Sequence, residues 1–316
     1  MTQEQHSVIG SGIYNYDIIA EREYPEGFVI GQNCRHEDCI RFEDVGGTCG
    51  NVISLLAHFG WKSMPQAQFD KSKEGLELKK FLEGYGCDTR YVENIEKGGT
   101  TRLLCLHKLD KQTGDHVMKP RVTGETRFAR RKQLRVKDEV EPFLAQLEAD
   151  SNNPNVYFFD AAEAGPRAIA AALRKKGTLV YFEPESDKDK SKFCHGIEVS
   201  DIVKFSGERV TDLSFCNDYK DKLFIQTLGS EGLKFSLKGG EWTLVKPVPV
   251  ENVVDWEGCG DTTTAAFLDF LSQHDALSFD SLTPELLKEG LEYASKKAAL
   301  CTQYLGSKSW IGHEND

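Results

Sequence analysis

Residues 255–271 read DWEGCGDTTTAAFLDFL, and this stretch decides the fold class. Its second half carries apolar residues at helical spacing, which predicts a helix over residues 261–273. Gly258 and Gly260 then stand in the turn into this helix, after an apolar strand expected at residues 253–254. Backbone N–H groups at a helix start lack partners within the helix, and the helix dipole attracts negative charge. Because glycine allows close approach, the turn predicts an anion-binding site.

Asp261, at the end of this turn, admits two interpretations. Aspartate is a common N-cap residue, so its role could be purely structural. Alternatively, its carboxylate could act as a general base that takes a proton from an attacking hydroxyl beside a bound phosphoryl group. On the local sequence alone, both roles stay open.

Outward from this stretch, short apolar segments alternate with helical patterns. Strands are expected within 8–20 and at 89–92, 156–160, 178–182, 201–204 and 223–227, and helices at 46–61, 74–85, 138–149, 166–176, within 188–200 and at 284–303. Such alternation predicts an α/β fold with a mostly parallel central sheet covered on both faces. Two further strand regions, at 27–45 and 101–122, fall outside the alternation, and a further hairpin is expected at about 233–245. The two strand regions predict a small accessory sheet.

Two further motifs suit the recognition of hydroxyl groups. Gly46 and Gly47 open a buried helix that carries Asn51 in its first turn. Residues 12–17, GIYNYD, follow the first strand and end at Asp17, whose carboxylate can accept two hydrogen bonds. In open α/β sheets, ligands bind beyond the carboxyl ends of the strands, where both motifs are expected. Plain turns explain each motif equally well when it is taken alone.

A fourth motif, Thr227-Leu-Gly229, follows an apolar strand late in the chain. Its position suits a loop that contacts a nucleotide, although a plain turn into a hairpin explains it as well. A dinucleotide-dependent oxidoreductase is disfavoured, because no G-x-G-x-x-G follows the first strand.

Composition narrows the partners. The chain of 316 residues has a formal net charge of −11, which argues against nucleic acid or an anionic membrane as a partner. No apolar run approaches the roughly 20 residues that span a bilayer, and the N-terminus lacks the pattern of a signal peptide. The nine scattered cysteines are then expected to be reduced thiols in a cytoplasmic protein.

In this order, the four motifs resemble those of the ribokinase-like family, also called the PfkB carbohydrate kinases. That family carries G-x-x-N-x-D near its start, GG-x-x-x-N at a helix start, T-x-G after a late strand, and a signature close to D-T-x-G-A-G-D. Here the motifs stand at residues 12–17, 46–51, 227–229 and 255–261, so the resemblance covers about residues 8–307.

The resemblance implies an ATP-dependent kinase that phosphorylates a hydroxyl of a sugar or sugar-like substrate, with ATP and Mg²⁺ as cofactors. Asp261 would be the catalytic base, beside an anion hole formed by the amides of Gly258, Cys259 and Gly260. Thr227 and Gly229 would contact ATP. The sugar would be bound by Asp17, Gly46, Gly47 and Asn51.

The resemblance also implies a single three-layer domain over residues 1–316. Lid strands would be inserted at about 14–45 and 98–122, and two copies would pair through the lid into a homodimer. The lid would close over the site and exclude water.

Some positions depart from the family pattern. Trp256 and Glu257 stand where relatives have small or hydroxyl residues, near a segment where some relatives bind a monovalent cation. The family element N-x-x-E, linked to Mg²⁺ and phosphate, corresponds here to Ser206 followed by Glu208, one place out of register. Glu208 is therefore the candidate Mg²⁺ ligand. These departures also motivate an alternative, a catalytically weak sugar- or nucleotide-binding regulator on the same fold.

Overall fold

A computed structural model describes residues 5–23, 38–96, 100–109, 119–122 and 139–313 of the chain. Its main body is built on a sheet with the strand order β13-β12-β11-β10-β9-β8-β1-β4-β5. Neighbouring strands from β11 to β5 run parallel, whereas β12 and β13 are antiparallel additions at one edge. This is the mostly parallel central sheet that the alternation predicts.

The strands of this sheet are short. Their bounds are β1 (Ser7–Ser11), β4 (Lys62–Asp70), β5 (Val92–Ile95), β8 (Val156–Phe159), β9 (Leu179–Phe182), β10 (Ile202–Ser206), β11 (Leu223–Thr227), β12 (Leu233–Leu237) and β13 (Thr243–Val245). In β1 and β8, successive residues point to opposite faces, as the pleat requires. Val8 and Phe158 belong to one apolar core, and Ile9 and Tyr157 belong to the other. The parallel strands are thus buried on both faces.

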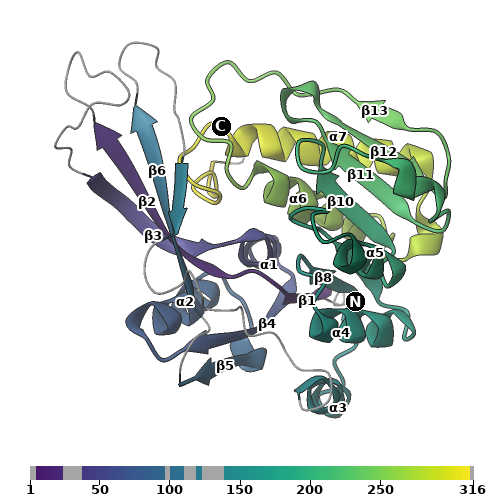
Figure 1. The fold of residues 1–316 in the computed structure, drawn as a ribbon, viewed down its shortest axis with the longest axis horizontal. Coiled ribbons are helices and arrows are strands. Elements are labelled where there is room, and N and C mark those ends of the chain that lie inside the picture. Colours follow the sequence, from purple (N-terminus) through teal and green to yellow (C-terminus); the bar gives the residue numbers. More distant parts are fainter. Residues whose placement is uncertain (1–4, 24–37, 97–99, 110–118, 123–138, 314–316) are drawn as a thin grey trace.

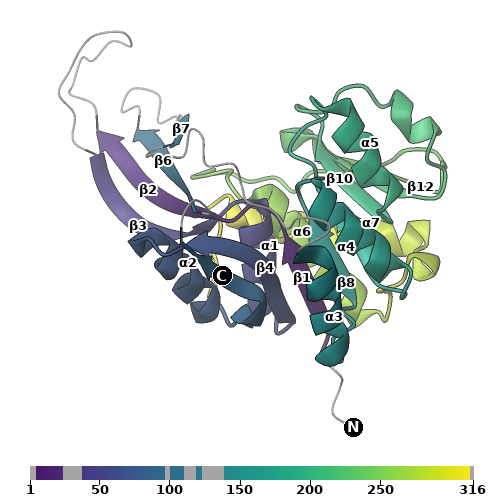
Figure 2. The ribbon, with the colours of Figure 1, turned by 60° about the horizontal axis from the view of Figure 1, so that its bottom comes forward.

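Within the described residues, seven α-helices form the outer layers. Their bounds are α1 (Thr48–His58), α2 (Lys73–Gly84), α3 (Glu141–Ala149), α4 (Ala164–Arg174), α5 (Lys190–Glu198), α6 (Cys259–Gln273) and α7 (Pro284–Cys301). Side chains of α1, α2, α6 and α7 pack into one core. Those of α3, α4 and α5 pack into the other, and Figure 2 shows these three helices along one side of the sheet. The three-layer α/β architecture is confirmed.

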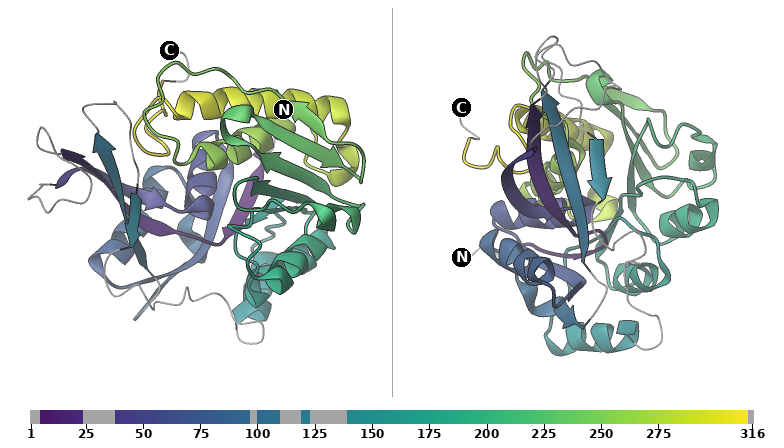
Figure 3. Two further views of the ribbon diagram at one scale, coloured as in Figure 1. Left: turned by 45° about the horizontal axis from the view of Figure 1, so that its top comes forward. Right: turned by 60° about the vertical axis from the view of Figure 1, so that its left-hand side comes forward.

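In the described part of the chain, a second sheet has four strands in the order β3-β2-β6-β7, and it stands out from the main body in Figures 1 and 3. Its strands are β2 (Asn15–Glu23), β3 (Asp38–Gly46), β6 (Thr101–Leu109) and β7 (Lys119–Val122). β2 pairs antiparallel with β3 and parallel with β6, and β6 pairs antiparallel with β7. The described parts of the two extra strand regions, residues 38–45, 101–109 and 119–122, therefore do form an accessory sheet, whereas residues 27–37 and 110–118 lie outside the described residues.

Three local predictions were wrong or incomplete. β4 has no counterpart in the sequence prediction, because KSMPQAQFD is largely polar and contains Pro65. Pro65 is tolerated because β5 pairs only with residues 67–70 of β4. No strand forms at residues 253–254, where Val253 is 48% exposed. Residues 89–91 form a short 3₁₀ helix, and the strand begins only at Val92.

None of the helices in the described part of the chain is long and apolar enough to cross a membrane.

Candidate active site

The turn into α6 has the geometry that its glycines require. Gly258 adopts φ +76°, which a residue with a side chain rarely adopts, and it caps α6 without a side-chain hydrogen bond. A Cβ at Gly258 would lie 2.1 Å from the Cβ of Ser307, so the turn packs directly against the C-terminal segment. A Cβ at Gly260 would meet only Lys204 Nζ, at 3.8 Å. Open space beside Gly260 and the ammonium group of Lys204 therefore adjoin the first turn of α6.

Asp261 lies within this first turn, and Gly258 occupies the N-cap position. The capping role considered for Asp261 is therefore wrong. Its Oδ2 instead accepts a hydrogen bond of 2.7 Å from Nδ2 of Asn51, which α1 supplies. Burial and the nearby Glu183 carboxylate raise the pKa of Asp261 to about 7. The Asn51 hydrogen bond and the charges of Lys204 and Lys308 oppose this rise.

A buried ion pair lies beside the same helix turn. Lys204 on β10 pairs with Glu183, which follows β9, and both side chains are largely buried. The second carboxylate oxygen of Glu183 accepts a hydrogen bond of 2.6 Å from Thr264 Oγ1 on α6. The sequence prediction missed this pair, because neither residue belongs to one of the four motifs. Its only signal is charge inside or just after apolar strands, a place where an unpaired charge is costly.

Asp17 lies on β2 directly opposite Asp44 of β3. Gly46 makes room for it, since a Cβ at Gly46 would lie 1.6 Å from Asp17 Oδ2. Asp17 Oδ1 is buried and has no hydrogen-bond partner within the described chain. Burial is the main cause that raises the pKa of Asp17 to about 8, and the carboxylates of Glu257, Asp44 and Asp261 add to it against the charge of Lys308. Asp17 therefore lies in the electrostatic field of Asp261.

Lys308, near the end of the chain, is a central residue of the site that the sequence prediction missed. Its side chain is 2% exposed. Its Nζ donates hydrogen bonds to Val45 O and Asn51 Oδ1, both at 2.6 Å, and to Ser307 Oγ at 3.0 Å. Asp44 Oδ2 lies 3.3 Å from the same nitrogen. No motif of the sequence marked this lysine, because its partners Asp44, Val45 and Asn51 are far away along the chain.

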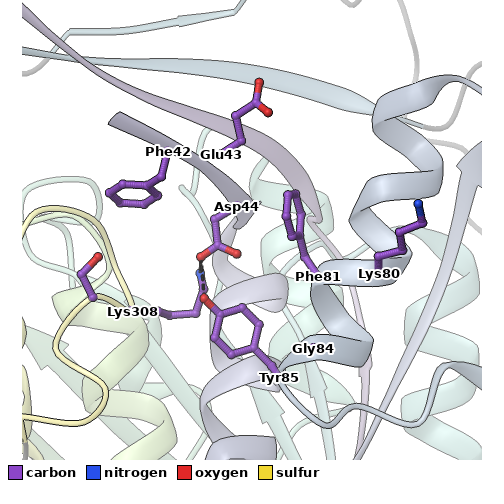
Figure 4. A pocket seen from close by; sticks show the side chains of 9 residues that line it. Phe42, Glu43, Asp44, Lys80, Phe81, Gly84, Tyr85 and Lys308 are labelled. Atoms are coloured by element: carbon purple, nitrogen blue, oxygen red, sulfur yellow. Dashed lines mark hydrogen bonds and ion pairs between the residues drawn. The ribbon is translucent and has the colours of Figure 1, made fainter. Parts of the chain in front are cut away.

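A pocket of about 350 Å³ adjoins Lys308 (Figure 4). In this view the Asp44 carboxylate points toward the ends of the Lys308 and Tyr85 side chains, and the Tyr85 hydroxyl donates to Asp44 Oδ2 at 2.8 Å. Phe42 and Phe81 also line the pocket. The pocket therefore shares Asp44 and Lys308 with the network that reaches Asn51.

Asp160, which follows β8, ties two of the motifs together. Its carboxylate accepts hydrogen bonds of 2.9 Å from the backbone N–H groups of Ile13 and Cys49. A Cβ at Gly12 would lie 2.0 Å from Asp160 Oδ1, which explains the glycine at that position. Gly47, the N-cap residue of α1, adopts φ +81° and has no side chain that could cap the helix. Asp160, which follows β8, serves as the cap instead. One carboxylate thus fixes both the turn before β2 and the start of α1.

Thr227 and Gly229, the motif residues expected to contact ATP, lie at the carboxyl end of β11. Thr227 ends β11 and is paired with Ser206, the last residue of β10. Gly229 follows with φ +59°. Glu208 is exposed just beyond β10, and its backbone N–H donates to Ser206 Oγ. Within the described residues, no group of three or more His, Cys, Asp or Glu side chains could hold a metal ion.

Trp256 and Glu257, the two positions that depart from the family signature, differ in their exposure to solvent. Trp256 is 53% exposed, whereas Glu257 is partly buried. Its backbone N–H donates to Asp255 Oδ1, and Asp255 Oδ2 accepts a second hydrogen bond, from Gly306 N–H. Asp255 thus ties the signature turn to the C-terminal segment.

The chain belongs to the pfkB family of carbohydrate kinases, because the model of that family matches residues 8–311. Members of this family are phosphotransferases with an alcohol group as acceptor, and this chain is one of them. A comparison with curated protein sequences returns no match.

Solved structures of sugar kinases share the fold. A microbiome-derived acarbose kinase superposes with a TM-score of 0.72 at 16% identity, covering 96% of this chain and 94% of the other. The ribokinase of Giardia lamblia gives 0.71 at 14% identity, with 97% of both chains covered. The ribokinase of Arabidopsis thaliana, solved with ribose and ATP, gives 0.65 at 18% identity, with 98% of both covered. At these identities the likeness establishes the ribokinase-like fold.

Proposed function

We propose that this chain transfers the γ-phosphoryl group of ATP to a hydroxyl group of a sugar or sugar-like substrate, with Asp261 as the general base. One observation carries the proposal. The Asp261 carboxylate lies in the first turn of α6, where it is oriented by Asn51 and has a pKa of about 7. A base with a pKa near the working pH is both ionised and basic enough to accept a proton.

In this mechanism the acceptor hydroxyl lies against Asp261. As its oxygen attacks the γ-phosphorus, its proton passes to the Asp261 carboxylate, and the bond between the γ-phosphorus and the bridging oxygen breaks to leave ADP. The proton later leaves Asp261 for solvent. The amides of Gly258, Cys259 and Gly260, with the helix dipole, stabilise the charge on the transferred group. Lys204, which is paired with Glu183, lies beside the same turn.

Asp17, Asn51 and the backbone at Gly46 and Gly47 would bind the acceptor. Asp17 suits this role, because its buried Oδ1 has no partner within the described chain and can accept a hydrogen bond from a substrate hydroxyl. Thr227 and Gly229 would contact ATP.

Mg²⁺ commonly binds through substrate phosphates, one or two carboxylates and water, so a site without a three-residue cluster suits it. Glu208, exposed beyond β10, is the carboxylate that would hold it. When bound, Mg²⁺ supplies positive charge that neutralises the phosphates. We assign no role to a monovalent cation.

The four-stranded sheet would serve as the lid of the site. It joins the main body directly at residues 12–14 and at Gly47, and it carries Asp17. Closure over the substrate would exclude water, so that the phosphoryl group reaches the sugar hydroxyl rather than a water molecule.

The test is a coupled ADP-release assay with Mg²⁺ and ATP against hexoses, ketoses, sugar acids, sugar phosphates and nucleosides. We expect turnover with at least one acceptor and its loss, by about a thousandfold or more, in Asp261→Asn. Asp269→Asn is the matched control, because Asp269 lies on the same helix but bonds to Trp61 and Gln273. Turnover that survives in Asp261→Asn would refute the mechanism. Thermal stabilisation by ATP or a sugar without turnover of any acceptor would favour the alternative, a catalytically weak sugar- or nucleotide-binding regulator.

A further inference from the structure

We propose that Lys308 is a positioning residue for Asp261, which it orients through the side-chain amide of Asn51. The inference rests on the proposed function, because it takes Asp261 as the general base. The contacts of Lys308 Nζ within the described chain are with Val45, Asn51, Ser307 and Asp44, and not with Asp261 itself. It acts on Asn51, the residue that contacts Asp261.

The chemistry of its two partners, Lys308 and Asp261, fixes the orientation of the Asn51 side-chain amide. A lysine ammonium can only donate hydrogen bonds, and an ionised carboxylate can only accept them. Asn51 Oδ1 therefore lies toward Lys308 Nζ, at 2.6 Å, and Nδ2 lies toward Asp261 Oδ2, at 2.7 Å. Ser307 Oγ donates to the same Oδ1 at 2.9 Å. With both donors on one side, rotation of the amide by 180° would place NH₂ against an ammonium group.

The lysine itself is held in place by several contacts. Its other partners are Val45 O and the Asp44 carboxylate, and Asp44 is in turn bonded to Tyr85. Figure 4 shows Lys308, Asp44 and Tyr85 together. A buried ammonium group with this many partners has no hydrogen left for a substrate, so its role is to hold other groups. The chain from Tyr85 through Asp44, Lys308 and Asn51 ends at Asp261.

Asn51 and Lys308 affect Asp261 in the same direction. The hydrogen bond from Nδ2 stabilises the ionised carboxylate, and so does the positive charge of Lys308. Removing either should raise the pKa of Asp261 and reduce the share of ionised base at neutral pH. The other charged or titratable groups that act on Asp261 come from several elements around it, namely Glu183, Lys204, Asp17, Cys49, Cys259 and Cys301. They remain unchanged when Lys308 is replaced.

The first measurement does not require turnover. Protein labelled with ¹³C at the aspartate carboxyl carbons is titrated by NMR, and the Asp261 signal is identified by its absence in Asp261→Asn. We expect a midpoint near pH 7 in the wild type and a rise of about one pH unit in Lys308→Gln. Glutamine removes the charge but keeps a hydrogen-bond donor at this position.

The second measurement is the pH profile of kcat with the acceptor that gives the highest turnover. In Lys308→Gln its acid limb should move to higher pH by the same amount, and kcat at pH 7 should fall about fivefold. Because Lys308→Gln leaves Asp44 without its ion-pair partner, Lys308→Met/Asp44→Asn is tested beside it. The double variant removes both charges, so it leaves no buried charge without its partner.

Lys222→Met is the matched control. Lys222 is also 2% exposed and paired with an aspartate, Asp221, but it precedes β11 at the opposite end of the strand from Thr227. This variant should leave the midpoint of Asp261 unchanged. If the Asp261 midpoint is unchanged in both Lys308 variants while turnover is still lost in Asp261→Asn, the role of Lys308 is refuted and the proposed function stands. Turnover retained in Asp261→Asn would instead refute the proposed function.

Discussion

At the scale of single residues, Asp17 shows how the site departs from what stability alone would favour. Its carboxylate is partly buried among other carboxylates, and one oxygen has no partner in the described chain. Burial is the main cause of its pKa of about 8. An unfolded aspartate has a pKa near 3.9, so the folded chain binds this proton more tightly than the unfolded chain. The free energy of unfolding therefore falls as the pH rises from about 4 to about 8.

Asp17→Asn should consequently stabilise the protein at alkaline pH, because asparagine removes the cost of ionising this site. We expect a gain of about 1 to 3 kcal/mol in the free energy of unfolding at pH 9 that shrinks toward pH 5, together with a higher KM for the acceptor. Denaturant unfolding across this range measures the gain. Asp212→Asn is the control, because Asp212 is exposed and a hydrogen bond from Ser214 lowers its pKa. A gain that does not depend on pH would contradict the argument.

Single residues also show where sequence reasoning succeeds and where it fails. Gly258 was predictable, because a glycine just before a helical pattern marks a turn that other residues rarely adopt. Lys308 was not, because the sequence around it resembles any exposed C-terminal segment and its burial depends on Asn51, 257 residues away. Asp160 was likewise missed, although an aspartate that ends an apolar strand often caps a neighbouring element.

At the scale of elements, helices α1 and α6 follow one design. Both begin at a glycine with positive φ and without a side-chain cap. In α1 the first-turn N–H of Cys49 is bound by Asp160, whereas in α6 the first turn adjoins Lys204. The first helix is thus fixed internally, and the second is suited to an external anion. The sequence predicted both helix starts, but it could not say which one the fold would cap.

The edges of the two sheets allow a test of the dimer that the family resemblance implies. Ile40 lies on β3, an edge strand of the four-stranded sheet, and is 58% exposed. Because an exposed edge with a large apolar side chain favours pairing with another chain, Ile40→Lys should convert a dimer into a monomer. Sedimentation velocity measures the change. Leu244→Lys is the matched control, since Leu244 is 55% exposed on β13, an edge strand of the central sheet. A wild-type monomer would contradict the expected assembly.

At the scale of the whole molecule, the candidate site is assembled from segments that span nearly the entire described chain. Asn51 meets Asp261 across 210 residues, and Lys308 meets Asn51 across 257. The motifs were expected at the carboxyl ends of the parallel strands, and Asn51 and Asp261 from two of them do meet, whereas no motif marked Lys308. The sequence could not predict the distances or the buried partners, since these follow from packing between elements that are far apart in the sequence.

The same architecture predicts how the molecule responds to its substrates. The four-stranded sheet carries Asp17, whereas α6 carries Asp261, and the two links between these parts that lie wholly within the described residues are short, at residues 12–14 and at Gly47. A substrate that bonds to both aspartates would hold the sheet against the main body. Hydrogen exchange of β2 and β3 should therefore slow severalfold more with a non-hydrolysable ATP analogue, Mg²⁺ and acceptor together than with either ligand alone.

Strands β12 and β13 serve as the internal control, because they lie at the edge of the central sheet remote from β1 in the strand order. Their exchange should change little when both ligands bind. Equal slowing in all four strands would indicate general stabilisation by mass action rather than closure. Protection of β2 and β3 by the acceptor alone would mean that closure does not wait for ATP, and the sheet would then act as part of the sugar site rather than as a lid over both substrates.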